Sequence, residues 1–440
     1  MSVISIPEGL QTKHCELGEG VLNEIPAILR KYWAQGTVIL VADTNTWAVA
    51  GEKVQQILRE SNISMVTPKI FPGQPILPPD YRFVQQLIPL LKGKIPIAVG
   101  SGVMNDLVKC ASTEAGCAGY MVVGTACSVD GYTSYGAALV VDGFKKTVPC
   151  AAPLAVLADS HILATAPSQM AASGYADMLA KVASGADWHI AATLGITPYN
   201  ETAWQMTQVK LRQWVGDPEG IASANPTALA NLFEGLAATG FAMQYMHDSR
   251  PASGAEHLLS HVWEMDGVTF KGEHPSHGFK VGIGILMVVS LMEYVFSKSK
   301  KEIAEICAKA PLKTVEQRLA EINNALAGST ILEQVKKVCV EKLPDEQTLR
   351  KRLSCIVEKW GQMKELVLNQ IFSFQEMRRR MKVVGCPVHP SGIGVDRKEM
   401  RRAVICAQMI RNRYTILDLL YDMGILEQSM NAVIDQVFEQ

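Results

Sequence analysis

The stretch Pro96 to Lys109, PIAVGSGVMNDLVK, is typical of a β-strand, a glycine turn and the start of a helix. Glycines let the backbone approach a diphosphate closely, and a helix N-terminus offers free N–H groups with a partial positive charge. The spacing departs from G-x-G-x-x-G because Asn105 stands where the third glycine would fall. The stretch therefore favours nucleotide binding and a simple turn about equally.

Similar patterns surround this stretch in the first part of the chain. Strand-like runs occur at Thr37 to Ala42 and around residues 65–71, and the pattern of Val54 to Arg59 between them is helical. Strands that alternate with helices indicate βαβ units and a mostly parallel sheet. We predict an α/β domain over residues 1–153.

From about Pro153 the strand signal fades and long amphipathic patterns take over. Alanine-rich segments cover residues 171–192 and 227–246, so we predict an all-helical domain over residues 154–440. Within it, Ser297 to Arg352 is rich in Lys and Glu, which suggests an exposed helical subregion.

The charge balance argues against several classes of partner. The 440 residues include 42 Lys and Arg and 43 Asp and Glu, a net charge of −1. A nucleic-acid binder or an anionic-membrane binder normally carries a basic excess, so neither partner is expected. The most apolar run, Val281 to Met292, is shorter than the ~18–20 residues that span a bilayer, and we predict a buried core helix there.

The cysteines and the N-terminus bear on the compartment. Ten cysteines are scattered without a C-x-x-C pair, and the first residues do not resemble a signal peptide. A reducing, cytoplasmic location is the expectation.

Two polar positions in the first domain have competing interpretations. Asp43 ends a predicted strand, where it could bind an adenosine ribose hydroxyl, but a helix cap before Thr44 is the preferred reading. The segment Val123 to Ser134 gathers hydroxyls around Asp130, and it could bind a polyol or a nicotinamide, or simply form an Asp-Gly turn.

The helical half carries the stronger signals. Asp177 lies among small apolar residues, and a buried carboxylate needs a cation, for which Lys181 four residues on is the favoured and non-catalytic candidate. Four of the nine histidines fall between His257 and His277. His257 and His261 share a helix face, but Leu258 replaces the Glu of H-E-x-x-H, so a peptidase is disfavoured. One carboxylate with two imidazoles would leave open positions on a divalent ion.

Together these segments resemble the family that contains glycerol dehydrogenase, dehydroquinate synthase and the iron-type alcohol dehydrogenases, and specifically its glycerol-1-phosphate dehydrogenase branch. The matching pieces occur in the expected order: IAVGSGVMNDLVK, VGTACSVDGYTS, GYADMLAKVASGADW, SRPASGAEHLLSH, HGFKVGIG, CPVHPSGIGVDR and IRNRYTILDLLYDMG.

The resemblance implies a Rossmann-like domain for NAD(H) or NADP(H), followed by an all-α, dehydroquinate-synthase-like domain. Its metal ligands would be Asp177, His257 and His277. The cofactor would meet Asp43, Gly100, Ser101, Gly102, Asp106, Thr125 and Ser128. The catalytic residues would be Asp130, facing the substrate, and His261, relaying a proton. We add Lys181 and Arg250 as expected phosphate contacts.

Three positions depart from that branch. Gly124 and Cys127 stand where it commonly has proline, which would loosen the cofactor loop. Phe279 follows His-Gly where a Glu is common, which would remove an outer acceptor and make His274 a competing ligand.

The implied reaction is the reversible reduction of dihydroxyacetone phosphate to sn-glycerol 1-phosphate, with one divalent ion, Zn²⁺, Ni²⁺ or Fe²⁺. The alternatives are a polyol dehydrogenase acting on unphosphorylated glycerol, a dehydroquinate-synthase-like cyclase, and a non-catalytic nucleotide-binding relative. A homodimer or larger homo-oligomer is expected from the resemblance.

Overall fold

A computed structural model describes residues 2–142 and 144–439. The chain divides into two compact units, of which the first holds residues 1–178, 202–252 and 383–385 and the second holds the remainder. The division falls inside helix α7 (Ser168–Thr193), which is itself unbroken.

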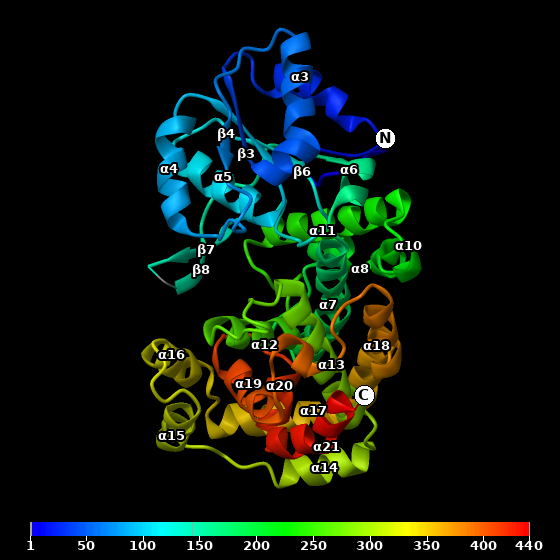
Figure 1. Cartoon of the computed structure of the whole chain (residues 1–440). Helices are drawn as coiled ribbons and strands as arrows, with labels where there is room; N and C mark the ends of the chain where they lie inside the picture. The colour runs from blue at the N-terminus through cyan, green and yellow to red at the C-terminus, as the bar shows by residue number, and fades with distance from the viewer. Residues whose placement is uncertain (1, 143, 440) are drawn as a thin grey trace. The chain divides into compact units, whose positions relative to one another are not determined.

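The first unit is built on a seven-stranded sheet (Figure 1). Its strands in chain order are β1 (Ser2–Val3), β2 (His14–Gly18), β3 (Val38–Asp43), β4 (Lys69–Phe71), β5 (Ile95–Gly100), β6 (Met121–Gly124) and β9 (Ala155–Asp159). The order across the sheet is β1-β2-β9-β6-β5-β3-β4, and all neighbours are parallel except β1 and β2. The predicted α/β class with a mostly parallel sheet is confirmed.

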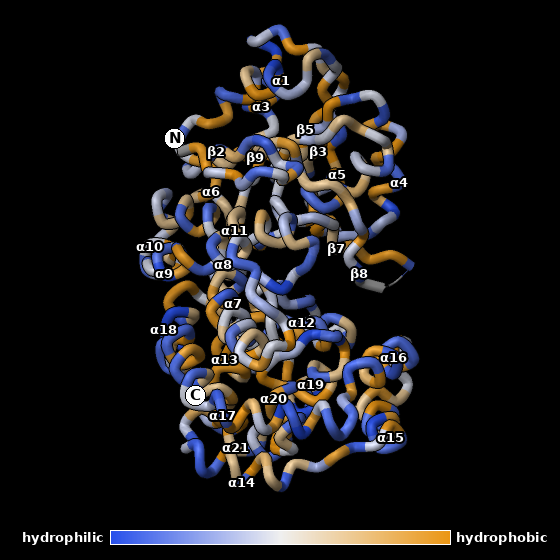
Figure 2. Tube along the Cα trace, turned by 180° about the vertical axis from the view of Figure 1, so that it is seen from behind, coloured by the Kyte–Doolittle hydropathy of each residue, from blue (hydrophilic) through white to orange (hydrophobic). Residues whose placement is uncertain are grey.

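Helices cover the sheet because its central strands are buried on both faces. Every residue of β5 is buried, as expected for an apolar run in a parallel sheet, and apolar residues run along the strands (Figure 2). The covering helices are α1 (Ile25–Tyr32), α3 (Glu52–Glu60), α4 (Tyr81–Leu91), α5 (Gly102–Glu114) and α6 (Ser160–Thr165). A separate hairpin of β7 (Ala137–Val141) and β8 (Phe144–Val148) packs against α4 and α5.

The first division between the compact units falls after residue 178, and not at residue 153 as predicted. Strand β9 lies just beyond that boundary and pairs with β2 and β6 in the centre of the sheet. Its five apolar-rich residues cannot be told from a buried helical segment by periodicity. The first unit also includes α8 (Glu201–Gln208), α9 (Leu211–Trp214), α10 (Pro218–Ala222) and α11 (Pro226–Met246).

The second unit is helical in its described residues and is centred on α13 (His277–Phe296). This helix is long and apolar enough to cross a membrane, but 83% of its most apolar window is buried inside the protein. The prediction of a buried core helix at Val281 to Met292 is confirmed. Its companions are α12 (Ala255–Met265), α14 (Lys300–Ala308), α15 (Val315–Ala325), α16 (Leu332–Lys342), α17 (Glu346–Gln370), α18 (Phe374–Val383), α19 (Arg397–Met409), α20 (Ile416–Asp422) and α21 (Leu426–Phe438).

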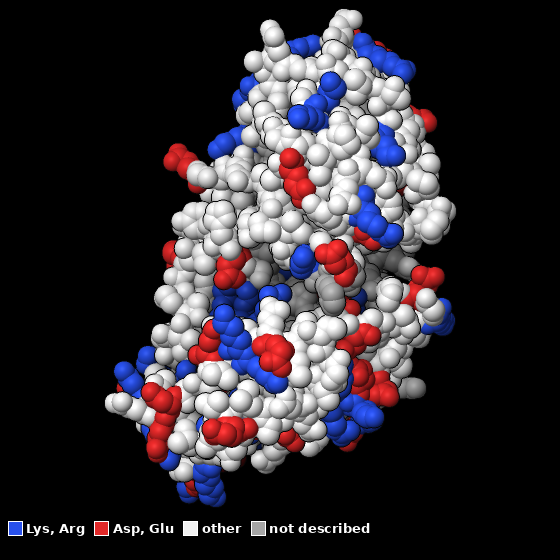
Figure 3. Space-filling view, turned by 90° about the vertical axis from the view of Figure 1, so that its left-hand side faces the viewer, with Lys and Arg blue, Asp and Glu red and all other residues white. Residues whose placement is uncertain are grey.

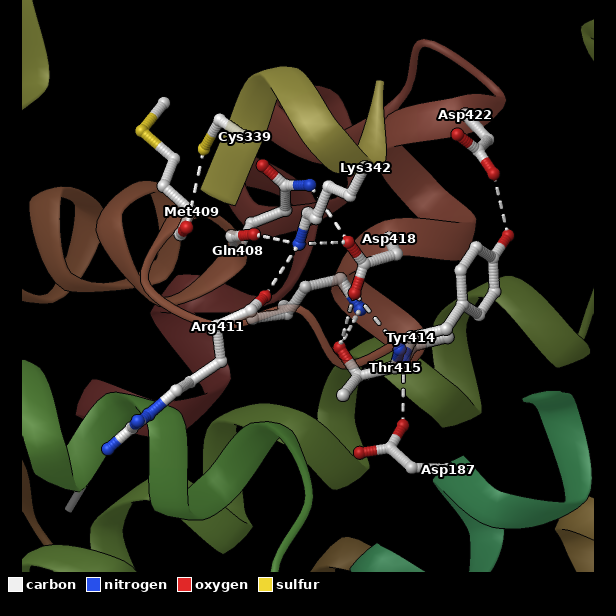
Figure 4. Close-up of polar contacts among 12 residues, drawn as sticks. Asp187, Cys339, Lys342, Gln408, Met409, Arg411, Tyr414, Thr415, Asp418 and Asp422 are labelled. Atoms are coloured by element: carbon white, nitrogen blue, oxygen red, sulfur yellow. Dashed lines mark hydrogen bonds and ion pairs between the residues drawn. The ribbon is translucent and has the colours of Figure 1, made fainter. Parts of the chain in front are cut away.

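The charged stretch 297–352 is helical as predicted, but part of its charge is buried. Lys342 on α16 places Nζ 2.7 Å from Oδ1 of Asp418 on α20 (Figure 4). Arg318 on α15 is 1% exposed and donates to Gln408 on α19 at 2.5 Å. Lys and Arg are interspersed with Asp and Glu on the face that Figure 3 presents, in keeping with the near-zero net charge.

Candidate active site

Helix α7 carries the carboxylate that the sequence singles out. Asp177 is fully buried, and its Oδ2 accepts the N–H of Asp130 at 3.0 Å. Lys181, one turn further along α7, is also fully buried. A buried carboxylate retains its charge only where donors or cations compensate for lost solvation, so this position suits a cation ligand.

Two histidines complete a set of possible metal ligands. His257 lies on α12, and His277 is the first residue of α13, whose cap is Ser276. The ligand atoms of Asp177, His257 and His277 all lie within 4.8 Å of one another. The three residues predicted as ligands are therefore brought together.

His274 is not part of this group. It is exposed, and its Nδ1 lies 3.2 Å from the carbonyl oxygen of Val268. The geometry therefore gives no support to His274 as a competing ligand.

Buried carboxylates orient both imidazoles. Nδ1 of His257 lies 2.8 Å from Oε1 of Glu256, and Nδ1 of His277 lies 2.9 Å from Oε1 of Glu264. Such bonds fix the tautomer and leave Nε2 to face an ion. One carboxylate and two imidazoles held in this way fit Zn²⁺, Ni²⁺ or Fe²⁺.

Sequence reasoning missed both glutamates. The expected loss of an outer acceptor at Phe279 is offset, because Glu264 supplies that acceptor from α12. A signal was present in the spacing, since positions 257, 261 and 264 fall on one face of a helix.

His261 lies beside the same carboxylate. Its Nδ1 is 3.3 Å from Oε2 of Glu264, and Nζ of Lys280 is 3.5 Å from Oε1. Burial lowers the pKa of His261 to about 4, so its ring is neutral at pH 7. A neutral ring can donate a proton at one nitrogen and accept one at the other.

The glycine turn joins β5 to α5. Ser101 is the N-cap in extended backbone, and among the described residues no side chain caps the first amides of α5. A Cβ at Gly102 would lie 2.9 Å from a methyl of Val129, so a larger residue would force a shift and glycine allows this close approach. Gly100, Ser101 and Gly102 thus expose a helix N-terminus suited to a diphosphate.

The side chain of Asp106 bonds within the protein. Oδ2 accepts the N–H of Ala138 on β7 at 3.1 Å, and Oδ1 lies 3.4 Å from Nζ of Lys109. Asp106 thus ties α5 to the β7–β8 hairpin. Its predicted contact with the cofactor remains a prediction.

Lys109 has a structural role that sequence reasoning did not identify. It is fully buried, and Nζ donates to the carbonyl oxygens of Gly131 at 2.8 Å and Gly136 at 3.0 Å. Asn105, one turn earlier, is also fully buried and accepts from the hydroxyl of Tyr120 at 2.8 Å. Helix α5 thus holds the loop that follows Asp130.

The predicted nicotinamide loop runs from the glycine turn towards Asp177. The N–H of Thr125 donates to the carbonyl oxygen of Gly100 at 3.1 Å, and both Thr125 and Ser128 are buried. A Cβ at Gly174 on α7 would overlap the carbonyl oxygen of Cys127, so glycine permits this close packing. The loop is fixed at both ends despite lacking the prolines at 124 and 127.

Asp43 is a helix cap in the structure. Its Oδ1 accepts the N–H groups of Asn45 and Thr46 at 2.9 and 2.8 Å. The carboxylate also stands at the C-terminal end of β3, on the sheet edge where the glycine turn begins. A ribose contact from this edge remains a prediction.

The two predicted phosphate contacts are buried cations. Arg250 is 5% exposed, and its backbone N–H donates to Oδ1 of Asp248 at 2.8 Å. Lys181 is fully buried on α7.

The sequence of the chain is similar to known enzymes. A family model described as iron-containing alcohol dehydrogenase matches residues 16–167. A glycerol-1-phosphate dehydrogenase of Halalkalibacterium halodurans is 35% identical over 67% of this chain and 73% of its own length. The one from Geobacillus thermodenitrificans is 31% identical over 92% of this chain and 91% of its own length, and both names include NAD(P)+.

The fold also has solved counterparts. The crystal structure of glycerol dehydrogenase from Schizosaccharomyces pombe matches with a TM-score of 0.58 and 14% identity, covering 98% of this chain and 93% of that one. At this identity the match concerns the fold alone.

Proposed function

The chain belongs to the iron-containing alcohol dehydrogenase family, in its glycerol-1-phosphate dehydrogenase branch, and we propose that it reversibly reduces dihydroxyacetone phosphate to sn-glycerol 1-phosphate. The single observation that carries the proposal is the convergence of Asp177, His257 and His277, whose ligand atoms lie within 4.8 Å of one another. A set of this composition serves Lewis-acid catalysis, in which developing charge on an oxygen is stabilised.

Each part of the site has a task in this reaction. When bound, a divalent ion would polarise the C2 carbonyl and a nicotinamide dinucleotide would supply hydride to C2. Asp177, His257 and His277 would hold the ion, and the glycine turn at 100–102 would hold the diphosphate. Thr125 and Ser128 would orient the nicotinamide end, because both are buried in the loop that bonds to Gly100.

Proton transfer falls to His261 in this proposal. Its neutral ring would pass a proton to the product oxygen from one nitrogen while accepting one at the other. Asp130 would face the substrate, since its own N–H is bonded to Asp177. Lys181 and Arg250 would bind the phosphate, Arg250 through its planar fork and Lys181 as a point charge.

Several finer points belong to the proposal. Zn²⁺ is the ion we favour over Ni²⁺ and Fe²⁺, and NAD(H) is favoured over NADP(H) if Asp43 meets the ribose. A cytoplasmic location is supported by ten cysteines that are all free thiols. A homo-oligomer is supported by the family alone.

The test is loss of NADH absorbance with dihydroxyacetone phosphate, using chelator-stripped protein before and after addition of Zn²⁺, Ni²⁺ or Fe²⁺. Metal-restored turnover that requires the phosphate group is expected. Oxidation of unphosphorylated glycerol with NAD⁺ as the hydride acceptor would indicate a polyol dehydrogenase, and activity without net NADH consumption would indicate a cyclase. NADH binding without metal and without turnover would contradict the proposal.

Ligand variants sharpen this test. Asp177→Ala and His257→Ala should abolish metal-restored turnover while circular dichroism shows an intact fold. His274→Ala is the matched control, because that exposed histidine lies outside the ligand group. Full activity in either ligand variant would contradict the metal assignment.

A further inference from the structure

Asp187 holds the N-termini of two helices at once. It lies on α7, is fully buried, and belongs to the second compact unit. Its Oδ2 accepts the N–H of Ala255, the first residue of α12, at 2.7 Å. Its Oδ1 accepts the N–H of Ile416, the first residue of α20, also at 2.7 Å (Figure 4). Helix-initial N–H groups have no partner within their helix and carry partial positive charge, which suits a buried carboxylate.

The segments that precede these two helices also bond to each other directly. The guanidinium of Arg413 donates to the carbonyl oxygen of Ser253 at 2.7 Å and to its hydroxyl. Between them, Gly254 approaches so closely that a Cβ would overlap the Asp187 carboxylate. Three sequence segments singled out by the family resemblance, around residues 187, 254 and 415, therefore meet at one point.

Gly254, which packs against Asp187, is linked to the ring of His257 through the side chain of Glu256. Oε1 of Glu256 accepts the N–H of Gly254 at 2.7 Å and lies 2.8 Å from Nδ1 of His257. Ala255, which Asp187 holds, precedes His257 by two residues on the same helix. The position and rotation of the α12 N-terminus thus determine where this imidazole points.

On the α20 side, Asp187 is linked to residues that lie outside the metal site. Thr415 donates its N–H to Oδ2 of Asp418 at 3.0 Å, and Oδ1 of Asp418 lies 2.7 Å from Nζ of Lys342 on α16 (Figure 4). The charged helices of the second unit are therefore joined to the segment that Asp187 holds.

We propose that Asp187 is a positioning residue for the metal ligand His257, and that it couples the metal site to residues 413–418. The inference rests on the proposed function, because it requires an ion at His257. Asp187 lies outside the group of possible metal ligands. Coupling of this kind is reciprocal, so ion binding should tighten the 413–418 segment as the segment supports ion binding.

The first experiment measures Co²⁺ affinity of the stripped full-length protein by chelator competition. Asp187→Asn leaves one acceptor oxygen and places an amide N–H₂ against the second helix terminus. We expect Co²⁺ to bind about tenfold to a hundredfold more weakly, as is typical when outer supports of ligands are lost. A folded Asp187→Asn variant with wild-type Co²⁺ affinity overturns the proposal.

Asp159 provides a matched control. It is a buried carboxylate of the first unit, and it also accepts two backbone N–H groups, those of Gly20 at 2.9 Å and His161 at 3.0 Å. Asp159→Asn should lose stability by a similar mechanism but keep Co²⁺ affinity within about twofold of wild type. An equal loss of affinity in both variants would show a general effect of destabilisation and overturn the proposal.

The second experiment needs no variant. Hydrogen–deuterium exchange is compared between stripped and Co²⁺-loaded wild-type protein. Slower exchange on loading is expected at residues 253–256 and 413–418, with no change at the amides of Gly20 and His161. Unchanged exchange at 413–418 overturns the coupling, even if Asp187→Asn does not fold. Failure of wild-type protein to bind Co²⁺ would instead contradict the proposed function itself.

Discussion

Nδ1 of His277 lies 2.9 Å from Oε1 of Glu264, a carboxylate on the neighbouring helix α12. The same carboxylate lies 3.3 Å from Nδ1 of His261 and 3.5 Å from Nζ of Lys280. We predict that Glu264→Ala weakens Zn²⁺ binding about tenfold to a hundredfold, because His277 loses the acceptor that fixes its tautomer. Chelator competition on the stripped protein measures the change.

Glu264→Gln should lose less affinity than Glu264→Ala, because an amide oxygen still accepts from Nδ1. Glu293→Gln is the control, since this glutamate of α13 accepts the N–H of Phe374 at 3.0 Å and stands outside the ligand group. Equal Zn²⁺ affinity for Glu264→Ala and wild type would show that the bond does not orient His277.

Lys109 should matter for the stability of the fold. We predict that Lys109→Met lowers the free energy of unfolding by about 3 kcal/mol, because two buried carbonyl oxygens lose a charged donor. Chemical denaturation measures it. Lys210→Met, which removes an exposed ion pair to Glu234, should change the free energy by less than about 1 kcal/mol. Similar values for the two variants would refute the assigned role.

Gly174 allows α7 to pack against the predicted nicotinamide loop. Gly174→Ala should lower the free energy of unfolding by about 1–3 kcal/mol and weaken NADH binding, because the added methyl displaces the carbonyl of Cys127. Fluorescence titration with NADH checks the binding. Gly361→Ala on α17 meets no atom within 4 Å and should stabilise the fold by about 0.5–1 kcal/mol. Unchanged NADH affinity in Gly174→Ala would contradict the prediction.

His189 predicts a pH dependence of stability. Burial lowers its pKa from 6.5 to about 4, and its Nδ1 bonds to the hydroxyl of Tyr199. Between these values the unfolded chain binds the proton and the folded protein does not, so stability falls as pH falls from 6.5 to 4. His189→Gln should show a shallower decline in the free energy of unfolding across that range. Parallel curves for variant and wild type would be inconsistent with this burial effect.

Local sequence patterns predict much of the fold. The β5 strand, its glycine turn and the apolar helix α13 have strong periodicity and clear breakers, so their types follow from short windows. Strand β9 was missed because its four apolar residues and terminal Asp159 can be strand or helix, and only pairing with β2 and β6 decides between them.

Local sequence identified some residues of the candidate site and not others. The ligand set could be proposed because Asp177 lies among small apolar residues, His257 and His277 belong to a cluster of histidines, and all three occur in family-like segments. Lys109 and Asp187 could not be recognised, because their function depends on backbone groups far away in the sequence. No local window contains both partners of such bonds.

Helix α13 begins at His277 and continues as one of the most deeply buried elements of its unit. Elements of this kind open only in rare, large-scale fluctuations. His277 itself is only partly buried, but the turns of α13 that follow it are held in the core, so the backbone that carries this ligand moves little. Release of an ion should therefore be governed by motion of the carboxylate and of α12, and a chelator should extract it slowly at temperatures well below the unfolding transition.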